Sequence, residues 1–379
     1  MNKVLLIPDS FKGTMSSLEI CEIMERALRQ HNPEAEIVSI PVADGGEGTV
    51  DAFLTAMGGE KVFLTVTGPL GTPVEAFYGR IGDTAVIEMA AAAGLPLIRG
   101  ELDPEGATTY GVGELMCHAA AAGAGRIVIG LGGSATTDGG CGAAAAAGVA
   151  FYDAQGAPFV PVGGTLKDVE RIDCSGLNPA LRAVEIVTMC DISNPLTGPQ
   201  GAAYVFAPQK GADAAAVERL DRGLKHLAEI VRAQLHREID AMPGAGAAGG
   251  MGGGMAAFFD SRLEMGIRTV LDTVEFDRLL EGADLVFTGE GKLDSQSLRG
   301  KVVVGVARRA RERKVPVIAV VGDIGDHIEA VYDEGVSAVF SINRVAVPYQ
   351  AARTRARDDL YLTMDNLCRL LNTQGLWGR

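Results

Sequence analysis

Short apolar runs that end in polar or Gly-rich segments recur along the chain. A Ser16-x-x-Glu19 capping box, with apolar residues at helical spacing behind it, predicts a helix after the first run. Further helices are predicted near 301–313 and 326–334. Because strands that alternate with helices are typical of parallel sheets, the pattern predicts an α/β fold. The predicted strands are 4–7, 36–42, 126–131, 184–189, 284–287 and 316–321.

The middle of the chain has a different pattern. Residues 62–90 look like consecutive strands joined by Gly- and Pro-containing turns, which indicates a mixed sheet. A long amphipathic helix is predicted at about 213–240, followed by a Gly-rich tract at 244–254 that we interpret as a hinge or domain junction. The predicted domains are a Rossmann-like parallel-sheet domain, made of residues 1–68 plus 262–379, and an inserted mixed-sheet α/β domain, 69–261, that includes the Gly-rich junction.

Composition supports two domains and narrows the range of partners. The chain has 379 residues, of which 47% are hydrophobic, and a net charge of −14. Such an acidic protein is a poor non-specific ligand for nucleic acids or anionic membranes, so neither is predicted as a partner. The six cysteines lack the spacing of a zinc site or a redox motif, and no signal-peptide or membrane-spanning segment is recognised. A cytoplasmic location is therefore predicted, whereas the oligomeric state is left open.

The segment IGLGGSATTDGG, residues 129–140, follows one predicted strand and precedes an Ala-rich helix. Glycines allow backbone N–H groups to approach a ligand, and a helix N-terminus favours an anion. Gly132, Gly133, Ser134 and Thr136 therefore form a candidate phosphate-binding loop, to which Thr137 can add a hydroxyl group. A tight turn with close packing of helix and strand is the alternative. Asp138 is also a candidate for a helix cap.

Four other predicted strands end in polar loops: 8–14, 43–49, 191–194 and 289–294. In open α/β sheets, ligands bind at the carboxyl ends of the strands, so these loops are expected to form a site. Phosphoryl transfer uses carboxylates, cations and a metal ion. The acidic and basic side chains of these loops are of the kinds that this reaction needs. Any single aspartate can instead be a cap or turn residue. The candidates are Asp9, Lys12, Asp44, Glu47, Asp191, Asn194, Glu290, Lys292 and Asp294.

Known nucleotide-binding motifs are missing or misplaced. Gly291-Lys292 and Gly300-Lys301 lack the remaining residues of a Walker A loop. A GxGxxG pattern at 244–249 follows a predicted helix, whereas the dinucleotide fingerprint needs a strand, so we interpret it as a false match. The five histidines form no metal-like pair, and nothing supports a Ser-His-Asp hydrolase.

Six ordered blocks give the chain a specific resemblance over nearly its whole length. The blocks lie at 8–13, 41–49, 130–140, 191–202, 243–252 and 288–297. In these residues the chain resembles the bacterial glycerate kinases of the two-domain α/β type. The resemblance implies a site in an interdomain cleft and phosphorylation of D-glycerate by ATP and Mg²⁺. The implied product is 2-phosphoglycerate, formed in sugar-acid or glyoxylate breakdown.

The resemblance also suggests roles for the candidate residues. Asp191 would activate the hydroxyl group or bind the metal ion, and Glu290 and Asp294 would contact metal or ribose. Lys12 would pair with the glycerate carboxylate or the transferred phosphate, so that Asp191, Lys12 and Asp294 are the catalytic candidates. Asp9, Ser10, Asp44 and Glu47 would line the glycerate side. Gly132, Gly133, Ser134, Thr136, Asn194 and Glu290 would contact ATP.

Three alternatives stay open at this point. A glycerate 3-kinase would give 3-phosphoglycerate. An NAD-dependent dehydrogenase would use residues 244–249 and bind NADH without binding ATP. A non-catalytic sugar-acid sensor would bind glycerate without consuming ATP, although no DNA-binding element is recognised that could transmit its signal.

Overall fold

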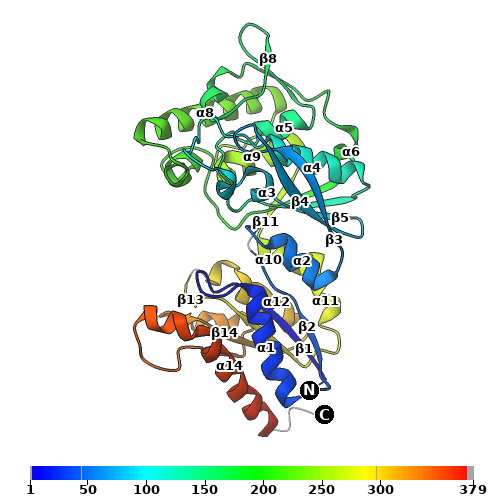
Figure 1. Cartoon of the computed structure of the whole chain (residues 1–379), viewed down its shortest axis with the longest axis vertical. Helices are drawn as coiled ribbons and strands as arrows, with labels where there is room; N and C mark the ends of the chain where they lie inside the picture. The colour runs from blue at the N-terminus through cyan, green and yellow to red at the C-terminus, as the bar shows by residue number, and fades with distance from the viewer. Residues whose placement is uncertain (1, 44, 296, 374–379) are drawn as a thin grey trace. The chain divides into compact units, whose positions relative to one another are not determined.

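The computed structural model describes residues 2–43, 45–295 and 297–373, which fall into two compact units (Figure 1). Unit 1 contains residues 1–43, 51–58 and 267–379, and unit 2 contains residues 44–50 and 59–266. The domain boundaries between residues 68 and 69 and between residues 261 and 262 stay a prediction.

Unit 1 is built on a five-stranded sheet in which every pairing is parallel. Apart from Lys3 and Thr288, the residues of its central strands are apolar or glycine and buried, because a parallel sheet covered on both faces leaves no polar side. The parallel sheet predicted from the strand–helix alternation is thus confirmed. The strands are β1 (Lys3–Pro8), β2 (Glu36–Ser39), β12 (Leu285–Gly289), β14 (Val317–Val321) and β16 (Ala338–Ser341).

The strand order in unit 1 places a topological switch between β1 and β12. The order along the sheet is β16-β14-β12-β1-β2, so the chain leaves β1 toward one edge and later returns to build the other. Pro8 pairs with Gly289 at the carboxyl ends of these two strands. Ligands of doubly wound sheets bind outside the carboxyl ends of the strands at such a point. Asp9 and Glu290 directly follow the two strands.

Helices α1 (Ser17–His31) and α14 (Tyr349–Thr373) pack against each other in unit 1 and are drawn in blue and red in Figure 1. The predicted capping box is present, since Ser16 and Glu19 bond reciprocally at the start of α1. The predicted helix at 326–334 is only one turn long. The other helices with residues in this unit are α2 (Thr49–Met57), α10 (Gly266–Thr273), α11 (Phe276–Leu279), η4 (Ser297–Arg299), α12 (Val302–Glu312) and α13 (Ala330–Asp333), and a short parallel pair is formed by β13 (Lys292–Leu293) and β15 (Asp323–Ile324).

Unit 2 contains the mixed sheet that the sequence predicted. Two antiparallel strands continue a parallel set, in the order β11-β10-β6-β5-β4-β3. The strands are β3 (Glu60–Thr67), β4 (Pro73–Ile81), β5 (Thr84–Glu88), β6 (Arg126–Gly130), β10 (Glu185–Met189) and β11 (Arg262–Glu264), and a separate small sheet contains β7 (Ala150–Tyr152), β8 (Pro158–Phe159) and β9 (Arg171–Asp173).

The helices of unit 2 surround a core of buried apolar residues. The long helix predicted at 213–240 is α8 (Ala214–Leu235), which Asp213 caps. Within the described ranges, every helix is too short or too polar to cross a lipid bilayer. The remaining helices are α3 (Ala90–Ala93), η1 (Leu95–Leu97), α4 (Tyr110–Ala121), α5 (Cys141–Ala146), η2 (Gly163–Asp168), α6 (Pro179–Arg182), α7 (Ala202–Phe206), η3 (Pro208–Lys210) and α9 (Ala247–Phe259).

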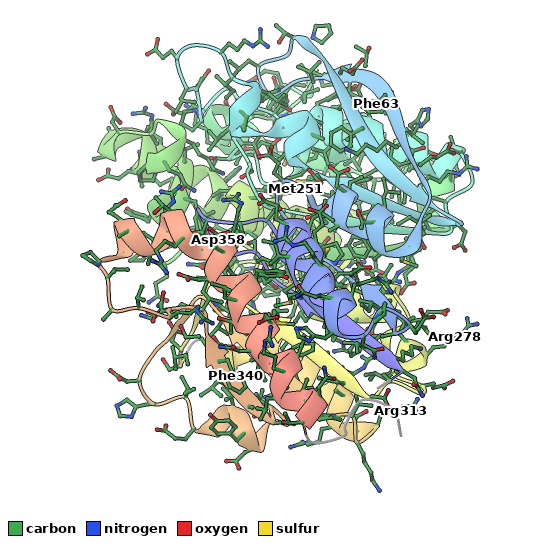
Figure 2. All side chains as sticks on the ribbon, turned by 60° about the horizontal axis from the view of Figure 1, so that its bottom comes forward. Phe63, Met251, Arg278, Arg313, Phe340 and Asp358 are labelled. Carbon is green, nitrogen blue, oxygen red and sulfur yellow. The ribbon has the colours of Figure 1, made fainter. Side chains whose placement is uncertain are left out.

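The Gly-rich tract differs from its predicted role as a hinge or junction. Residues 247–259 form α9 inside unit 2, and Met251, labelled in Figure 2, is fully buried. A Cβ at Gly249 would lie 2.0 Å from Thr136 O, and one at Gly254 would lie 2.2 Å from Gly139 O. The glycines are therefore needed because α9 packs directly on the backbone of the 129–140 loop.

Candidate active site

The candidate phosphate loop emerges from the carboxyl end of β6, in the middle of the parallel part of the unit 2 sheet. Gly130 pairs with Glu88 at the end of β5 and with Met189 at the end of β10. The segments that follow these three strands therefore begin at one edge of the sheet. Glu88 is buried and accepts a hydrogen bond from Val50 N at 2.7 Å, which holds the 45–50 segment at the same edge.

Close approach to the 45–50 segment explains two of the loop glycines. A Cβ at Gly130 would lie 2.3 Å from Gly45 O, and one at Gly132 would lie 2.5 Å from Gly46 Cα. Gly132 N also donates to Gly45 O at 2.9 Å. The packing alternative considered for this loop thus accounts for Gly130 and Gly132, which are in contact with protein backbone rather than open to a ligand.

Gly133 and Ser134 have the backbone geometry of an anion cradle. Gly133 is exposed, with φ +77°, a conformation that favours glycine. Their neighbour Ala135 donates its N–H to Ala93 O, but the N–H groups of Gly133 and Ser134 donate to no acceptor in the described part of the chain. Two successive free N–H groups at a strand end can bind a phosphate oxygen.

The Asp138 carboxylate binds N–H groups at the start of the following helix α5, so that helix does not offer its N-terminus to a ligand. The Asp138 carboxylate accepts hydrogen bonds from Thr109 N, Thr109 Oγ1, Gly140 N and Gly142 N. Helix α5 is only six residues long. The N-cap of α5 is Gly140, so Asp138 is not the cap residue, although its carboxylate accepts from N–H groups at the start of the helix. Because these N–H groups are used within the protein, the helix contribution expected for the phosphate loop is wrong. Burial nevertheless raises the pKa of Asp138.

Hydroxyl groups line the buried side of the loop. Thr136 Oγ1 and Thr137 Oγ1 are buried, and neither has a hydrogen-bond partner among residues 2–43, 45–295 and 297–373. Ser134 Oγ accepts a hydrogen bond from Lys210 Nζ at 2.8 Å. Lys210 was not predicted as a site residue, because the sequence around it, Ala207-Pro208-Gln209-Lys210, matches no known motif.

Asp191 and Asn194 follow β10 at the same edge of the sheet. Asp191 is exposed, and its Oδ1 accepts a hydrogen bond from Gly266 N at 2.6 Å. Asn194 Nδ2 donates to Gln200 O at 2.7 Å, so this amide holds its own loop. Glu47 is exposed in the 45–50 segment, and Asp44 lies outside the described residues.

The second group of candidates lies in unit 1, at the switch between β1 and β12. Glu290 is buried, and its Oε1 has no hydrogen-bond partner within the described chain. The pKa of Glu290 is raised to about 7, mainly by burial and to a smaller extent by the nearby charges of Asp9 and Asp294, whereas Ser297 and Lys301 oppose the rise. The structure thus brings three of the predicted carboxylates close together.

The loops that follow β1 and β12 lie against each other. Asp9 N donates to Gly289 O at 2.8 Å, and a Cβ at Gly291 would lie 3.4 Å from Lys12 N. Ser10 N donates to Asp9 Oδ1 at 2.6 Å, which fixes the turn after β1. The Lys12 side chain is exposed at this edge. Asp9, Ser10 and Lys12 therefore belong to a loop that lies against the segment containing Glu290.

The two groups supply oxygen ligands that suit Mg²⁺. No cluster of three His, Cys, Asp or Glu side chains in the described residues could hold a metal ion by itself. Mg²⁺ is usually bound by one or two carboxylates together with water and phosphate oxygens. The unpartnered oxygen of Glu290 and the exposed carboxylate of Asp191 each fit such partial coordination.

Comparison with known proteins gives one consistent result. The model of the glycerate kinase family matches residues 4–372. A glycerate kinase of Bacillus cereus is 44% identical over 96% of this chain and 97% of its own length, and the glycerate 2-kinase of Escherichia coli K12 is 45% identical over 90% of each. A crystal structure described as glycerate kinase 2 of Salmonella typhimurium LT2 superposes with a TM-score of 0.86 at 42% identity, covering 99% of both chains.

Proposed function

The chain belongs to the glycerate kinase family, and we propose that it transfers the terminal phosphoryl group of ATP to the 2-hydroxyl group of D-glycerate. The observation that supports this most directly is the 45% identity with a relative named glycerate 2-kinase, over 90% of the chain. The dehydrogenase alternative is not favoured, since residues 244–249 follow a helix and lead into α9 rather than following a strand. We also infer a cytoplasmic location.

The Gly133 and Ser134 N–H groups are the best-placed donors for phosphate oxygens of ATP. They need no lysine-rich surface, which suits a chain of net charge −14. Gly132 shapes the loop through Gly45, and Thr136 contributes a hydroxyl group with no other partner in the described chain. Asn194 supports the ATP side indirectly, by holding its own loop through Gln200.

Asp191 is our candidate for the general base. Its carboxylate is exposed at a strand end, and Gly266 N orients one of its oxygens. A carboxylate in this position can accept the proton of the attacking hydroxyl group as the bond to phosphorus forms. The donor from Gly266 holds the carboxylate in one orientation without neutralising it.

On the unit 1 side, Lys12 is the exposed cation that would pair with an anionic group of the substrate. Asp9 and Ser10 precede it in the same loop, and we assign both to glycerate; Glu47 and Asp44 stay separate candidates for the same substrate. We keep Asp294 as a catalytic candidate because its charge acts on Glu290. These assignments rest on the polar loops that follow the strands in the sequence.

Glu290 in unit 1 and Asp191 in unit 2 are separate candidates for a carboxylate ligand of Mg²⁺. When bound, Mg²⁺ would neutralise the negative charge that develops during phosphoryl transfer. The protein contribution at Glu290 is a buried oxygen that no other described group occupies. A cation at this position would favour the ionised carboxylate against the effect of burial.

Phosphorus NMR of the protein with D-glycerate, ATP and Mg²⁺ tests the proposal. Phosphate on carbon 2 has one neighbouring proton and gives a doublet, whereas phosphate on carbon 3 has two and gives a triplet. A new doublet is expected. A triplet would keep the kinase and change the product to 3-phosphoglycerate. Unchanged ATP with folded protein would contradict the proposal and favour the sensor alternative.

A further inference from the structure

Lys210 is a lysine enclosed by protein directly behind the candidate phosphate loop. Lys210 is the last residue of the short helix η3 and is only 2% exposed to solvent. Lysine is almost never fully buried without a partner, because removing an ammonium group from water is costly. A buried lysine in this position therefore calls for an explanation from its contacts.

Both hydrogen bonds of the ammonium group go to the loop. Lys210 Nζ donates to Ser134 Oγ at 2.8 Å and to Thr136 O at 2.6 Å. These two acceptors lie on either side of Ala135, so one side chain fixes the backbone over three consecutive residues. The free N–H group of Ser134 belongs to this stretch, and that of Gly133 immediately precedes it.

The bond to Ser134 also decides the direction of the serine hydroxyl group. In its ammonium form, which the charge of Asp138 favours, Lys210 has three donors and no acceptor, so Ser134 Oγ is the acceptor in this contact. The hydroxyl hydrogen then has to point elsewhere, and Ser134 donates it to no group in the described residues. It is therefore available to an oxygen of a bound phosphate.

Asp138 supplies the compensating charge from the other end of the loop. The pKa of Lys210 is lowered to about 7, mainly because the residue is buried. The negative charge of the fully buried Asp138 carboxylate opposes this lowering. Asp138 is held by Thr109, Gly140 and Gly142, so its position is fixed independently of Lys210. The loop thus has a fixed anion at one end and a lysine behind its centre.

We propose that Lys210 is a positioning residue for ATP, which fixes the Ser134–Thr136 backbone and turns the Ser134 hydroxyl hydrogen toward a phosphate oxygen. The inference rests on the proposed function of the loop. Lys210 acts through Ser134 and need not touch the nucleotide. If Lys210 only stabilised the fold, its replacement would not change the KM for ATP more than the KM for D-glycerate.

Steady-state kinetics of Lys210→Met, Ser134→Ala and the double variant test this role. Met keeps most of the volume of lysine and removes its donors. We expect each single variant to raise the KM for ATP about tenfold or more, since hydrogen bonds to charged groups are involved. The KM for D-glycerate is expected to stay within about twofold. Because both act through one hydroxyl group, the double variant is expected to be no worse than Lys210→Met.

The control variant is Lys225→Met, which removes an exposed lysine of α8 in the same unit. It should leave both KM values unchanged. Equal increases in the KM for ATP and for D-glycerate, or single effects that multiply in the double variant, would overturn the proposal. If Lys210→Met does not fold, an unchanged KM for ATP in folded Ser134→Ala would overturn it too. Absence of turnover in the wild type would instead contradict the proposed function.

Discussion

Two buried carboxylates, Asp138 and Glu290, have opposite hydrogen-bonding environments. Asp138 accepts four hydrogen bonds from the protein, so its lone pairs are used in holding the loop. Glu290 has one oxygen without a partner within the described residues. A buried polar atom without a partner costs free energy, and functional sites are where such atoms are retained. Asp138 is therefore structural, and Glu290 is the better candidate for contact with a ligand.

We predict that Asp191→Asn lowers kcat by about 10²- to 10⁴-fold, the usual contribution of a general base. The amide keeps the shape and the bond from Gly266 N but does not accept the substrate proton. Asp358→Asn, on the exposed side of α14 and labelled in Figure 2, is the control. Near-normal turnover by Asp191→Asn would remove Asp191 from the mechanism.

Replacing Glu290 by Gln should change how stability depends on pH. The pKa of Glu290 is raised from 4.5 to about 7 in the folded protein. The folded state therefore binds a proton more tightly than the unfolded state. This stabilisation is fully present below pH 4.5 and is lost as the pH rises through about 7. The loss amounts to on the order of 3 kcal/mol.

Glu290→Gln is therefore expected to be more stable than the wild type at pH 8 and to lose this part of the pH dependence. Urea unfolding in metal-free buffer at pH 5 and pH 8 measures both effects. Glu312→Gln, an exposed change on α12, is the matched control. A pH dependence that is the same in the wild type and in Glu290→Gln would show that burial does not perturb this carboxyl group.

At the scale of elements, α9 and η3 position the phosphate loop from its buried side. Helix α9 contacts the loop through bare backbone, and Gly139 N donates to Gly249 O at 3.1 Å. Lys210 lies at the end of the 3-10 helix η3, and its ammonium group donates a hydrogen bond to Ser134 of the same loop. Both elements are far from the loop in sequence, so the loop conformation depends on tertiary packing.

We predict opposite effects for two neighbouring glycine substitutions in α9. Alanine is favoured over glycine inside a helix by about 1 kcal/mol. At Gly253 a Cβ would meet its nearest atoms at 3.5 Å, so Gly253→Ala should be neutral or stabilising. At Gly254 a Cβ would lie 2.2 Å from Gly139 O, so Gly254→Ala should destabilise by about 1–3 kcal/mol. Thermal unfolding distinguishes them; equal stabilisation by both would show that α9 does not pack tightly on the loop.

The sequence predicted elements whose signals are local. The capping box at Ser16, the strands between 60 and 88 and the apolar run of β1 follow from propensity and periodicity. Residues 244–254 have no such periodicity, and glycine content alone does not distinguish a hinge from a tightly packed helix. The loop at 129–140 was recognised, but Lys210 was not, because only the fold brings it to Ser134.

The whole molecule is acidic, while its proposed substrates are anions. The net charge of −14 produces a field that repels ATP and glycerate at long range. At short range the loop N–H groups and Lys210 act within a few ångströms, where salt screens much less effectively. Attraction and repulsion therefore respond differently to ionic strength.

We accordingly predict that the KM for ATP falls by about twofold as ionic strength rises from about 0.01 to 0.15 M, since screening weakens the long-range repulsion first. The measurement uses potassium acetate at fixed free Mg²⁺, with sucrose at matched osmolality as the control. A KM that rises steadily with salt would mean that exposed cations, rather than buried donors, dominate ATP binding.

The construction of unit 1 from distant segments has a consequence for biosynthesis. Strand β1 is made long before its partner β12, since Thr288, which donates to Ile7 O, lies 281 positions after it. At about 5–20 residues per second, a ribosome takes roughly 15–60 seconds to cover that distance. The segment 59–266 is complete by then. Unit 2 can therefore fold first on the ribosome, while the nascent β1 waits with its apolar residues unpaired by β12 and open to chaperones.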